Sequence, residues 1–366
     1  MRLCSVAVAD FRNVRSVQME PGDRFNLLYG CNGQGKTNLL EAIYLLGNPR
    51  SFRASRLPEL VRHGERQARI RGQVESGGMQ NRLTLLVEAG GRKVEVDGKA
   101  VHKASELHGK LNAVVFSPDD TGMVRMGPES RRRYLDRAVY MGDIGYLHSW
   151  HSYQRILKQR NHLLKNADRT GLEIWTEKLA ETGAEVIERR HAYVAVLDNK
   201  LQKYYTTIAG DEETSRLSYN PEGVQTTDRD SIREELLELF KRHQRSDERY
   251  GTTTAGPHRD DLTFILNDRP LKAFGSQGQQ KSFVLALKMA EMDNLQETFG
   301  EAPLLLLDDM SSELDARRNH NLMEFLTTRE IQVFITTTER SPALLEAAPH
   351  CAVFHVEGGN LTFEGS

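Results

Sequence analysis

The chain has 366 residues, of which 39% are apolar and 27% are charged, with 49 basic and 51 acidic side chains. The formal net charge of −2 excludes a protein that coats nucleic acid or membranes through bulk positive charge, so any nucleic-acid contact has to be local. The three cysteines form no Cys-x-x-Cys pair, which argues against a zinc module and favours a reducing compartment. The start of the chain is too polar for a signal peptide and no apolar run is long enough to span a membrane, so a cytoplasmic location is expected.

The first hundred residues predict strands around one early helix. Alternating apolar residues from Leu3 and the compact run Phe25 to Tyr29 are typical of strands. After a glycine-rich loop, apolar residues recur at helical spacing until Gly47, where the helix is expected to end. Residues 69–101 predict short strands, with Asp97-Gly98 as a tight hairpin turn.

The middle of the chain predicts helices. From about Glu129 to Arg249 apolar residues recur every three or four positions, and the longest helix is expected to span about 35 residues, or roughly 50 Å. A further helix is expected to open at Ser231, with Glu234 completing a capping box. This length suits an arm and not a coiled coil of hundreds of ångströms.

After Gly251 the α/β pattern returns. Leu304 to Leu307 and Val333 to Ile335 are short apolar runs of the kind found in buried parallel strands. The predicted fold class is therefore α/β, with a β-rich N-terminal subdomain and an inserted helical lobe. We expect one domain from residues 1–125 and 251–366, and the lobe from residues 126–250.

The segment Gly30 to Thr37 matches the pattern G-x-x-x-x-G-K-[ST], which lies between a predicted strand and a predicted helix. Glycines let backbone N–H groups wrap phosphates, Lys36 reaches the β- and γ-phosphates, and the Thr37 hydroxyl binds Mg²⁺. The alternative is a glycine-rich turn with a surface lysine. The predicted ATP-binding residues are Gly30, Cys31, Asn32, Gly33, Gln34, Gly35, Lys36, Thr37 and Asn38.

Hydrolysis needs a carboxylate for Mg²⁺ and a group that positions the attacking water. The predicted strand that ends at Leu307 is followed by Asp308 and Asp309. We expect Asp308 to contact Mg²⁺ together with Thr37, and Asp309 to act as the base or water-orienting group, so that Lys36, Asp308 and Asp309 form the catalytic set. The alternative is a pair of residues that cap a helix.

Ser276-Gln277-Gly278-Gln279-Gln280-Lys281 resembles the signature motif of ABC-type ATPases, although a polar turn of this kind is by itself usually a helix cap. The resemblance implies that Ser276, Gln277, Gly278 and Gln279 contact the γ-phosphate of a nucleotide held by another subunit. Residues 311–315 resemble the D-loop of the same ATPases, and 336–338 stand where these proteins place a switch residue. The order of these elements predicts a two-fold dimer with ATP sandwiched between the subunits.

Further segments at Asn13, 51–53, 116–120, 131–136 and 256–261 complete a resemblance to the RecF family of bacterial recombination-repair proteins over essentially the whole chain. This implies an ABC-type P-loop ATPase head that binds ATP and Mg²⁺, dimerises when ATP binds, and holds gapped or junction DNA without sequence specificity. It also implies a RecR-type mediator, a nucleoid-associated location and no membrane partner. The second carboxylate is Asp309 where most ABC ATPases have glutamate, which implies slow hydrolysis.

A local basic stretch covers residues 129–169, with nine basic and four acidic side chains. Basic residues on helices neutralise phosphates without reading sequence, so binding is expected to be salt-sensitive. The alternative is a solvated helix face with intrahelical ion pairs. The candidate DNA-binding residues are Arg131, Arg132, Arg133, Arg155, Lys158 and Arg160.

His258 could relay the nucleotide state to the lobe, and a structural histidine is the alternative. Three other functions remain open at this stage: the ATPase subunit of a transporter, an SMC-like chromosome-organising or nuclease-associated head, and a scaffold that senses nucleotide without hydrolysing it. The helical insert argues against the first. The second would carry far longer coiled-coil arms, and measured hydrolysis distinguishes the third.

Overall fold

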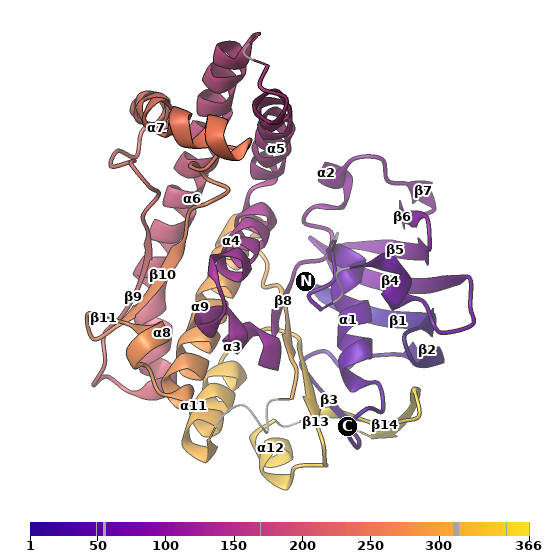
Figure 1. The fold of residues 1–366 in the computed structure, drawn as a ribbon. Helices are drawn as coiled ribbons and strands as arrows, with labels where there is room; N and C mark the ends of the chain where they lie inside the picture. Colours follow the sequence, from indigo (N-terminus) through magenta and orange to yellow (C-terminus); the bar gives the residue numbers. More distant parts are fainter. Residues whose placement is uncertain (49, 54–55, 169, 310–314, 349, 366) are drawn as a thin grey trace. The chain divides into compact units, whose positions relative to one another are not determined.

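The computed structural model describes residues 1–48, 50–53, 56–168, 170–309, 315–348 and 350–365 (Figure 1). The chain forms two compact units. The head unit comprises residues 1–121, 204–211 and 276–366, and the helical unit comprises residues 122–203 and 212–275. None of the helices in the described ranges combines the length and the apolar character needed to cross a membrane.

An antiparallel sheet forms one layer of the head unit, with strand order β2-β1-β4-β5-β6-β7. Its strands alternate between buried apolar and exposed polar residues, so one face packs into the core and the other meets solvent. As expected, Asp97 and Gly98 both have positive φ and form the turn between the last two strands. The strands are β1 (Arg2–Phe11), β2 (Val14–Met19), β4 (Gln67–Ser76), β5 (Met79–Glu88), β6 (Gly91–Val96) and β7 (Lys99–Ala100).

A second, mostly parallel sheet has the order β15-β14-β3-β13-β12-β8, and only β15 is antiparallel to its neighbour. Its central strands are buried on both faces, which explains their uninterrupted apolar sequences. The strands are β3 (Phe25–Tyr29), β8 (Ala113–Phe116), β12 (Leu304–Leu307), β13 (Val333–Thr337), β14 (Ala352–Glu357) and β15 (Asn360–Gly365).

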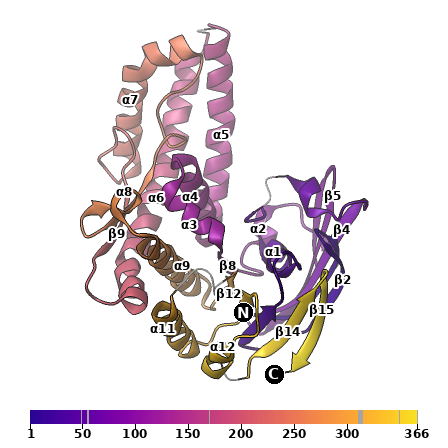
Figure 2. The ribbon, with the colours of Figure 1, turned by 60° about the horizontal axis from the view of Figure 1, so that its bottom comes forward.

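Helix α1 (Lys36–Gly47) contacts strands of both sheets, and it lies between them in both views (Figures 1 and 2). Nine of its twelve residues are buried, including the polar residues Lys36 and Glu41. The other helices of the head unit are η1 (Leu57–Leu60), α2 (Ala104–Leu107), α9 (Gln277–Phe299), α11 (Ala316–Thr327) and α12 (Pro342–Ala347).

The helical unit is dominated by long helices. The longest, α6, has 38 residues, in agreement with the expected length, and its last turns cluster with the head unit. The helices are α3 (Pro118–Arg125), which begins in the head unit, α4 (Pro128–Gly142), α5 (Ile144–Lys165), α6 (Leu172–Ala209), α7 (Arg229–Tyr250) and α8 (Leu271–Phe274).

One local prediction for this region is wrong, and one small sheet was not predicted. Helix α7 begins at Arg229, and its cap is Asp228, whose carboxylate accepts a hydrogen bond from the Ser231 amide. Ser231 therefore lies inside the first turn and opens no capping box. The sequence analysis also missed a small sheet, in the order β11-β10-β9, made of β9 (Ser215–Tyr219), β10 (Leu262–Leu266) and β11 (Arg269–Pro270).

The expected domain division stays a proposal. Residues 251–275, which we assigned to the head, cluster with the helical unit. Strand β10 pairs there with β9, so the chain returns to the head unit only at Ser276.

Candidate nucleotide-binding site

The glycine loop leaves the carboxyl end of β3 and enters α1. Gly30, Gly33 and Gly35 all have positive φ, a conformation that other residues rarely adopt. At Gly30 a Cβ atom would lie 2.2 Å from the carbonyl oxygen of Val356, so no larger residue fits. Helix α1 starts at Lys36 with Gly35 as its N-cap, which has no side chain to bond the first amides. These N–H groups and the helix dipole therefore suit a bound phosphate.

Lys36 lies beneath this loop and is only 8% exposed. Its Nζ donates hydrogen bonds to the carbonyl oxygens of Gly30 (2.5 Å) and Cys31 (2.9 Å). Burial lowers the pKa of Lys36, and the nearby carboxylates of Asp309 and Asp308 counteract part of this effect. The Lys36 side chain thus connects the start of the loop to its end, and it places its ammonium group beneath the centre of the loop.

Asp308 directly follows β12 and connects helix α1 with strand β13 at the carboxyl edge of the parallel sheet. Its Oδ1 accepts hydrogen bonds of 2.8 Å from Thr37 Oγ1 and from Thr336 Oγ1. Burial raises the pKa of Asp308, and the two hydroxyl donors and the charge of Arg53 oppose this rise. The next residue, Asp309, has φ 52°, and its amide donates to the same Thr336 hydroxyl. The structure therefore brings together Lys36, Thr37 and both carboxylates.

A pocket of about 380 Å³ lies over these groups. Parallel strands place their carboxyl ends at one edge of a sheet. The segments that follow β3, β8 and β12 line the pocket, together with Thr336 near the end of β13. Its lining residues are Asn32, Gly33, Gly35, Lys36, Thr37, Asn38, Arg53, Ser117, Pro118, Asp119, Asp308, Asp309 and Thr336.

The pocket suits Mg²⁺ as well as phosphate. The Thr37 hydroxyl and the Asp308 carboxylate are hard oxygen ligands within 2.8 Å of each other, which is the chemistry that Mg²⁺ prefers. Thr37 and Asp308 are the residues that would hold the ion, and other oxygens would come from phosphate and water.

Contacts from distant segments fix the shape of the loop, and the sequence analysis did not predict them. Asn13 donates to the Gly33 carbonyl and accepts from the Asn38 side chain. The turn between β14 and β15 donates its amides to Gln34: Gly358 to Oε1 at 2.6 Å and Gly359 to the carbonyl at 2.9 Å. The Gly-Gly pair between two apolar runs was the available signal for a tight turn there.

The predicted signature lies at the start of α9. Ser276 is the N-cap and forms a reciprocal capping box with Gln279. The alternative interpretation of this motif, a helix cap, thus describes what Ser276 does within one protomer. Gly278 lies against Arg318: a Cβ atom at position 278 would be 2.5 Å from a guanidinium nitrogen of Arg318. Of the predicted D-loop, 311–314 lie outside the described residues, and Asp315 caps α11.

The predicted DNA-binding residues divide into two groups. Arg131 and Arg160 are buried: Arg131 pairs with Asp261, and Arg160 with Asp247 at 2.8 Å. Both guanidinium groups already pair with a carboxylate, which is partly exposed for Asp261 and buried for Asp247, and this argues against these two residues as phosphate contacts. Arg132, Arg133, Arg155 and Lys158 keep accessible surface, although Arg132 bonds the Asp260 carbonyl and Arg133 pairs with Glu129.

His258 lies in the helical unit, where its contacts are those of a structural histidine. Its ring nitrogens bond the Tyr153 hydroxyl at 2.6 Å and the Thr253 carbonyl at 3.1 Å. Burial lowers the pKa of His258 to about 4, so the ring is neutral at physiological pH.

A glycine loop, its lysine and a strand carboxylate at the edge of a parallel sheet define a P-loop ATPase head of the ABC type. The family model "RecF/RecN/SMC N terminal domain" matches residues 2–362. The chain belongs to the RecF family.

Curated relatives support membership of the RecF family over the full length of the chain. The protein named DNA replication and repair protein RecF from Trichlorobacter lovleyi is 51% identical, covering 100% of this chain and 99% of its own. The protein of the same name from Geotalea uraniireducens is 47% identical, and the match covers 99% of this chain and 100% of the relative.

Solved structures agree. The structure of the recombination mediator protein RecF-ATP in the RecFOR pathway is similar with a TM-score of 0.90 and 34% identity, covering 99% of both chains. An Smc head domain from Pyrococcus furiosus, with a TM-score of 0.58 and 15% identity over 100% of this chain and 96% of its own, shares the fold.

Proposed function

We propose that the chain is an ATP-dependent DNA-binding protein of the RecF type that acts in recombinational DNA repair and replication restart at gapped or junction DNA. The observation that carries this proposal is the hydrogen bond between Thr37 and Asp308, which joins the glycine loop to the strand carboxylate beneath the pocket. The full-length relatives named DNA replication and repair protein RecF support the biological role. The RecF-ATP structure supports ATP as the nucleotide.

In this proposal the protein's own groups position the phosphates. The amides at the start of α1 and the Lys36 ammonium bind the β- and γ-phosphates, which releases Lys36 from the loop carbonyls. Thr37 and Asp308 would hold Mg²⁺, which would supply positive charge to neutralise the phosphate oxygens. Asp309 orients the attacking water, and its backbone is fixed by the hydrogen bond that its amide donates to the Thr336 hydroxyl. Hydrolysis is slow because this second carboxylate is the shorter aspartate.

The site is completed by a second copy of the chain. Ser276 and the amides at the start of α9 present an N-terminus suited to a γ-phosphate held by the partner subunit. ATP binding therefore drives head-to-head dimerisation, and the dimer holds DNA until hydrolysis releases it. Since ATP and DNA both favour the dimer, each strengthens binding of the other.

DNA contacts in this proposal come from the accessible basic side chains of the helical unit. Arg155 and Lys158 are exposed on α5, and Arg133 is exposed on α4. They contact phosphates and read no bases, so binding is not sequence-specific. A RecR-type mediator is the proposed protein partner, and the "RecFOR pathway" of the matched structure is consistent with it.

Steady-state ATP hydrolysis, measured with and without gapped DNA, tests the enzyme assignment. We expect slow turnover that DNA stimulates, and loss of turnover in Lys36→Ala. Sedimentation tests the dimer: Asp309→Asn is expected to accumulate as a dimer with saturating ATP. A variant that stays monomeric while binding ATP would contradict the sandwich, and wild-type turnover equal to that of Lys36→Ala would contradict the ATPase.

Because the fold is shared with an Smc head, a second candidate function is the ATPase head of an SMC-like chromosome-organising or nuclease-associated complex. Helix α6 spans about 57 Å at 1.5 Å per residue, which is short for such an arm. Gel shifts compare the candidates. A preference for gapped over intact duplex DNA favours the RecF-type role, and retention of closed circles without that preference favours the alternative.

A further inference from the structure

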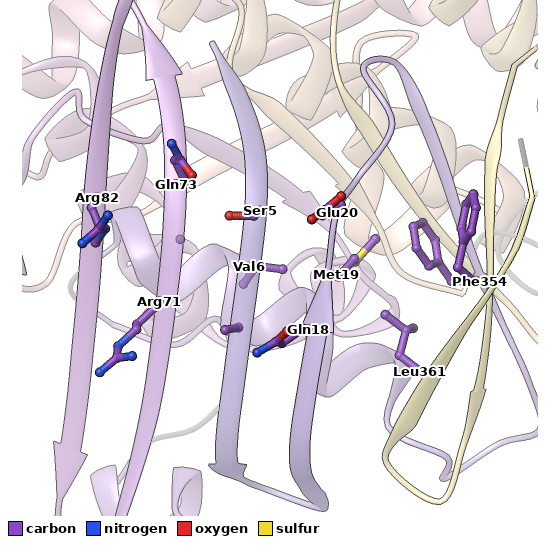
Figure 3. Close-up of a pocket in the computed structure, with 13 residues that line it drawn as sticks. Ser5, Val6, Gln18, Met19, Glu20, Arg71, Gln73, Arg82, Phe354 and Leu361 are labelled. Carbon is purple, nitrogen blue, oxygen red and sulfur yellow. The ribbon is translucent and has the colours of Figure 1, made fainter.

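A second hollow, of about 620 Å³, lies in the head unit and shares no lining residue with the nucleotide pocket (Figure 3). It crosses the solvent face of the antiparallel sheet and reaches the β14–β15 hairpin. Its lining residues are Ser5, Val6, Ala7, Gln18, Met19, Glu20, Arg71, Gly72, Gln73, Arg82, Phe354, Leu361 and Phe363.

The hollow exists because β1 carries small residues between strands that carry long ones. Ala7 lies opposite Gln18 on β2 and opposite Arg71 on β4. Ser5 lies opposite Gln73, which in turn lies opposite Arg82 on β5. Directly opposed side chains stand about 5 Å apart, so the small residues form a floor between longer walls.

One wall is basic. The side chains of Arg71 and Arg82 are exposed, and within the described ranges neither guanidinium forms an ion pair or a side-chain hydrogen bond. Gln73 between them donates to Gln80. Glu20 is the one acidic residue of the lining. It directly follows β2, and Figure 3 shows it on the other side of β1 from both arginines. Asp97 accepts a hydrogen bond from the Arg82 backbone amide, but within the described ranges no carboxylate pairs with either guanidinium group.

The opposite wall is apolar. Phe354 and Met19 are buried, but Phe363 is 59% exposed although its ring packs against Phe354 with centroids 5.3 Å apart. Leu361 stands beside them and is partly exposed (Figure 3). Exposed apolar surface next to polar groups is typical of protein interaction sites.

We propose that this hollow docks a partner protein through a short segment in which an apolar side chain precedes acidic residues. The apolar side chain packs on Leu361 and Phe363, and the carboxylates bind Arg71 and Arg82, whose planar guanidinium groups suit bidentate contacts. Glu20 sets the orientation, since it repels a carboxylate from the apolar side. A nucleic-acid backbone fits less well, because it needs cations along its length and meets here an apolar wall and a glutamate. The proposal does not depend on the nucleotide site.

Fluorescence anisotropy tests this surface with a labelled peptide, Gly-Phe-Gly-Asp-Asp-Gly, on the full chain. The double variant Arg71→Glu/Arg82→Glu is expected to weaken binding at least about tenfold. The matched control Lys93→Glu/Lys99→Glu makes the same charge change on exposed residues of the same sheet outside the hollow, and is expected to bind the peptide as the wild type does. Equal loss in both doubles would show a bulk charge effect and would overturn the proposal.

Two further binding measurements test whether the hollow binds this kind of segment specifically. Replacing the peptide's phenylalanine by alanine is expected to weaken binding to the wild type but not to Phe363→Ala, because both changes remove the same apolar contact. Single-stranded and duplex oligonucleotides are expected to bind both double variants equally. If Arg71→Glu/Arg82→Glu loses oligonucleotide binding while peptide binding is unchanged, the hollow is a nucleic-acid surface and the proposal fails. Lys36→Ala is expected to bind the peptide normally, so failure of the ATPase assignment leaves this result unaffected.

Discussion

Thr37 donates a hydrogen bond of 2.8 Å from Oγ1 to Oδ1 of Asp308, a residue 271 positions further along the chain. The same carboxylate oxygen accepts from Thr336, and the side chain is only 4% exposed. A buried carboxylate between two hydroxyl donors gives a rigid metal ligand, and it also leaves a negative charge in a poorly solvated place.

Asp308→Asn is expected to raise the melting temperature of the nucleotide-free protein at neutral pH by a few degrees. Burial raises the pKa of Asp308 above its unfolded value, so the charged form is less favourable in the folded state. Asparagine keeps an acceptor for both hydroxyls without the charge. The stabilisation by Mg²⁺ and ATP is expected to disappear. Differential scanning fluorimetry with and without Mg²⁺ and ATP measures both effects.

Acid pH provides the control for this substitution. As pH falls through the raised pKa, Asp308 becomes protonated in the wild type, so the difference in melting temperature between the two proteins should shrink. A variant that keeps the full Mg²⁺-dependent shift would show that Asp308 is not a metal ligand.

Gly359→Ala is expected to lower both stability and ATP affinity more than Gly358→Ala. Both glycines have positive φ, so each substitution carries a similar backbone cost of about 1 kcal/mol. At Gly359, however, a Cβ would lie 2.4 Å from the Asn13 carbonyl, while at Gly358 nothing lies within 4 Å. The clash displaces the turn that holds Gln34, and we expect about tenfold weaker ATP binding by calorimetry. Equal affinities in the two variants would mean that the turn does not support the loop.

Arg160→Met and Arg155→Met separate packing from DNA binding on one helix. Arg160 is buried and donates to Asp247 (2.8 Å) and Thr253 (2.7 Å), so its loss leaves a buried carboxylate unpaired and is expected to cost about 3–5 kcal/mol of unfolding free energy. Arg155 is exposed, and its loss is expected to change stability by less than about 0.5 kcal/mol.

The same pair tests the proposed DNA surface. Arg155→Met is expected to weaken DNA binding and to reduce the slope of log affinity against log salt by about one. Urea denaturation and salt-dependent gel shifts are the measurements. An unchanged slope in Arg155→Met would place the DNA surface elsewhere.

Stability is expected to fall as the pH decreases from about 6.5 to about 4, in part through His258. Its folded pKa of about 4 lies below the ordinary histidine value of 6.5, so the unfolded chain binds the proton more readily across this window. The contribution is complete above the unfolded pKa, is lost progressively towards pH 4, and is on the order of 3 kcal/mol. Urea denaturation at several pH values, compared with His258→Gln, measures it. A pH dependence identical in both proteins would assign the loss to other groups.

Local sequence patterns predicted the strand, loop and helix around Gly30 and the strand before Asp308 well, because these elements are encoded in short contiguous segments. The loop from Gly30 needs glycines for its backbone conformation, and the carboxylates need a buried strand before them. Both requirements leave a readable pattern. The contacts of Gln34 with Gly358 and Gly359 could not be predicted, because nothing near Gln34 indicates which distant turn packs against it.

The helical unit shows the opposite case. Arg131 and Arg160 belong to a basic stretch, and charge alone suggested exposure. Their partners, Asp261 and Asp247, lie 130 and 87 positions away, and only the fold brings the charges together. For α7 the error was local: Asp228 and Ser231 are both good caps, and propensity does not decide between them.

The separation of Thr37 and Asp308 also matters during synthesis. Strand β3 and the glycine loop leave the ribosome early. Strand β13, which pairs with β3 and carries Thr336, and strand β12, which pairs with β13 and is followed by Asp308, are made only near the end. A nascent or truncated chain therefore has the phosphate loop without its carboxylate, and its β3 has no partner strand from the C-terminal segment. In the proposed function, nucleotide binding therefore begins only when translation is almost complete.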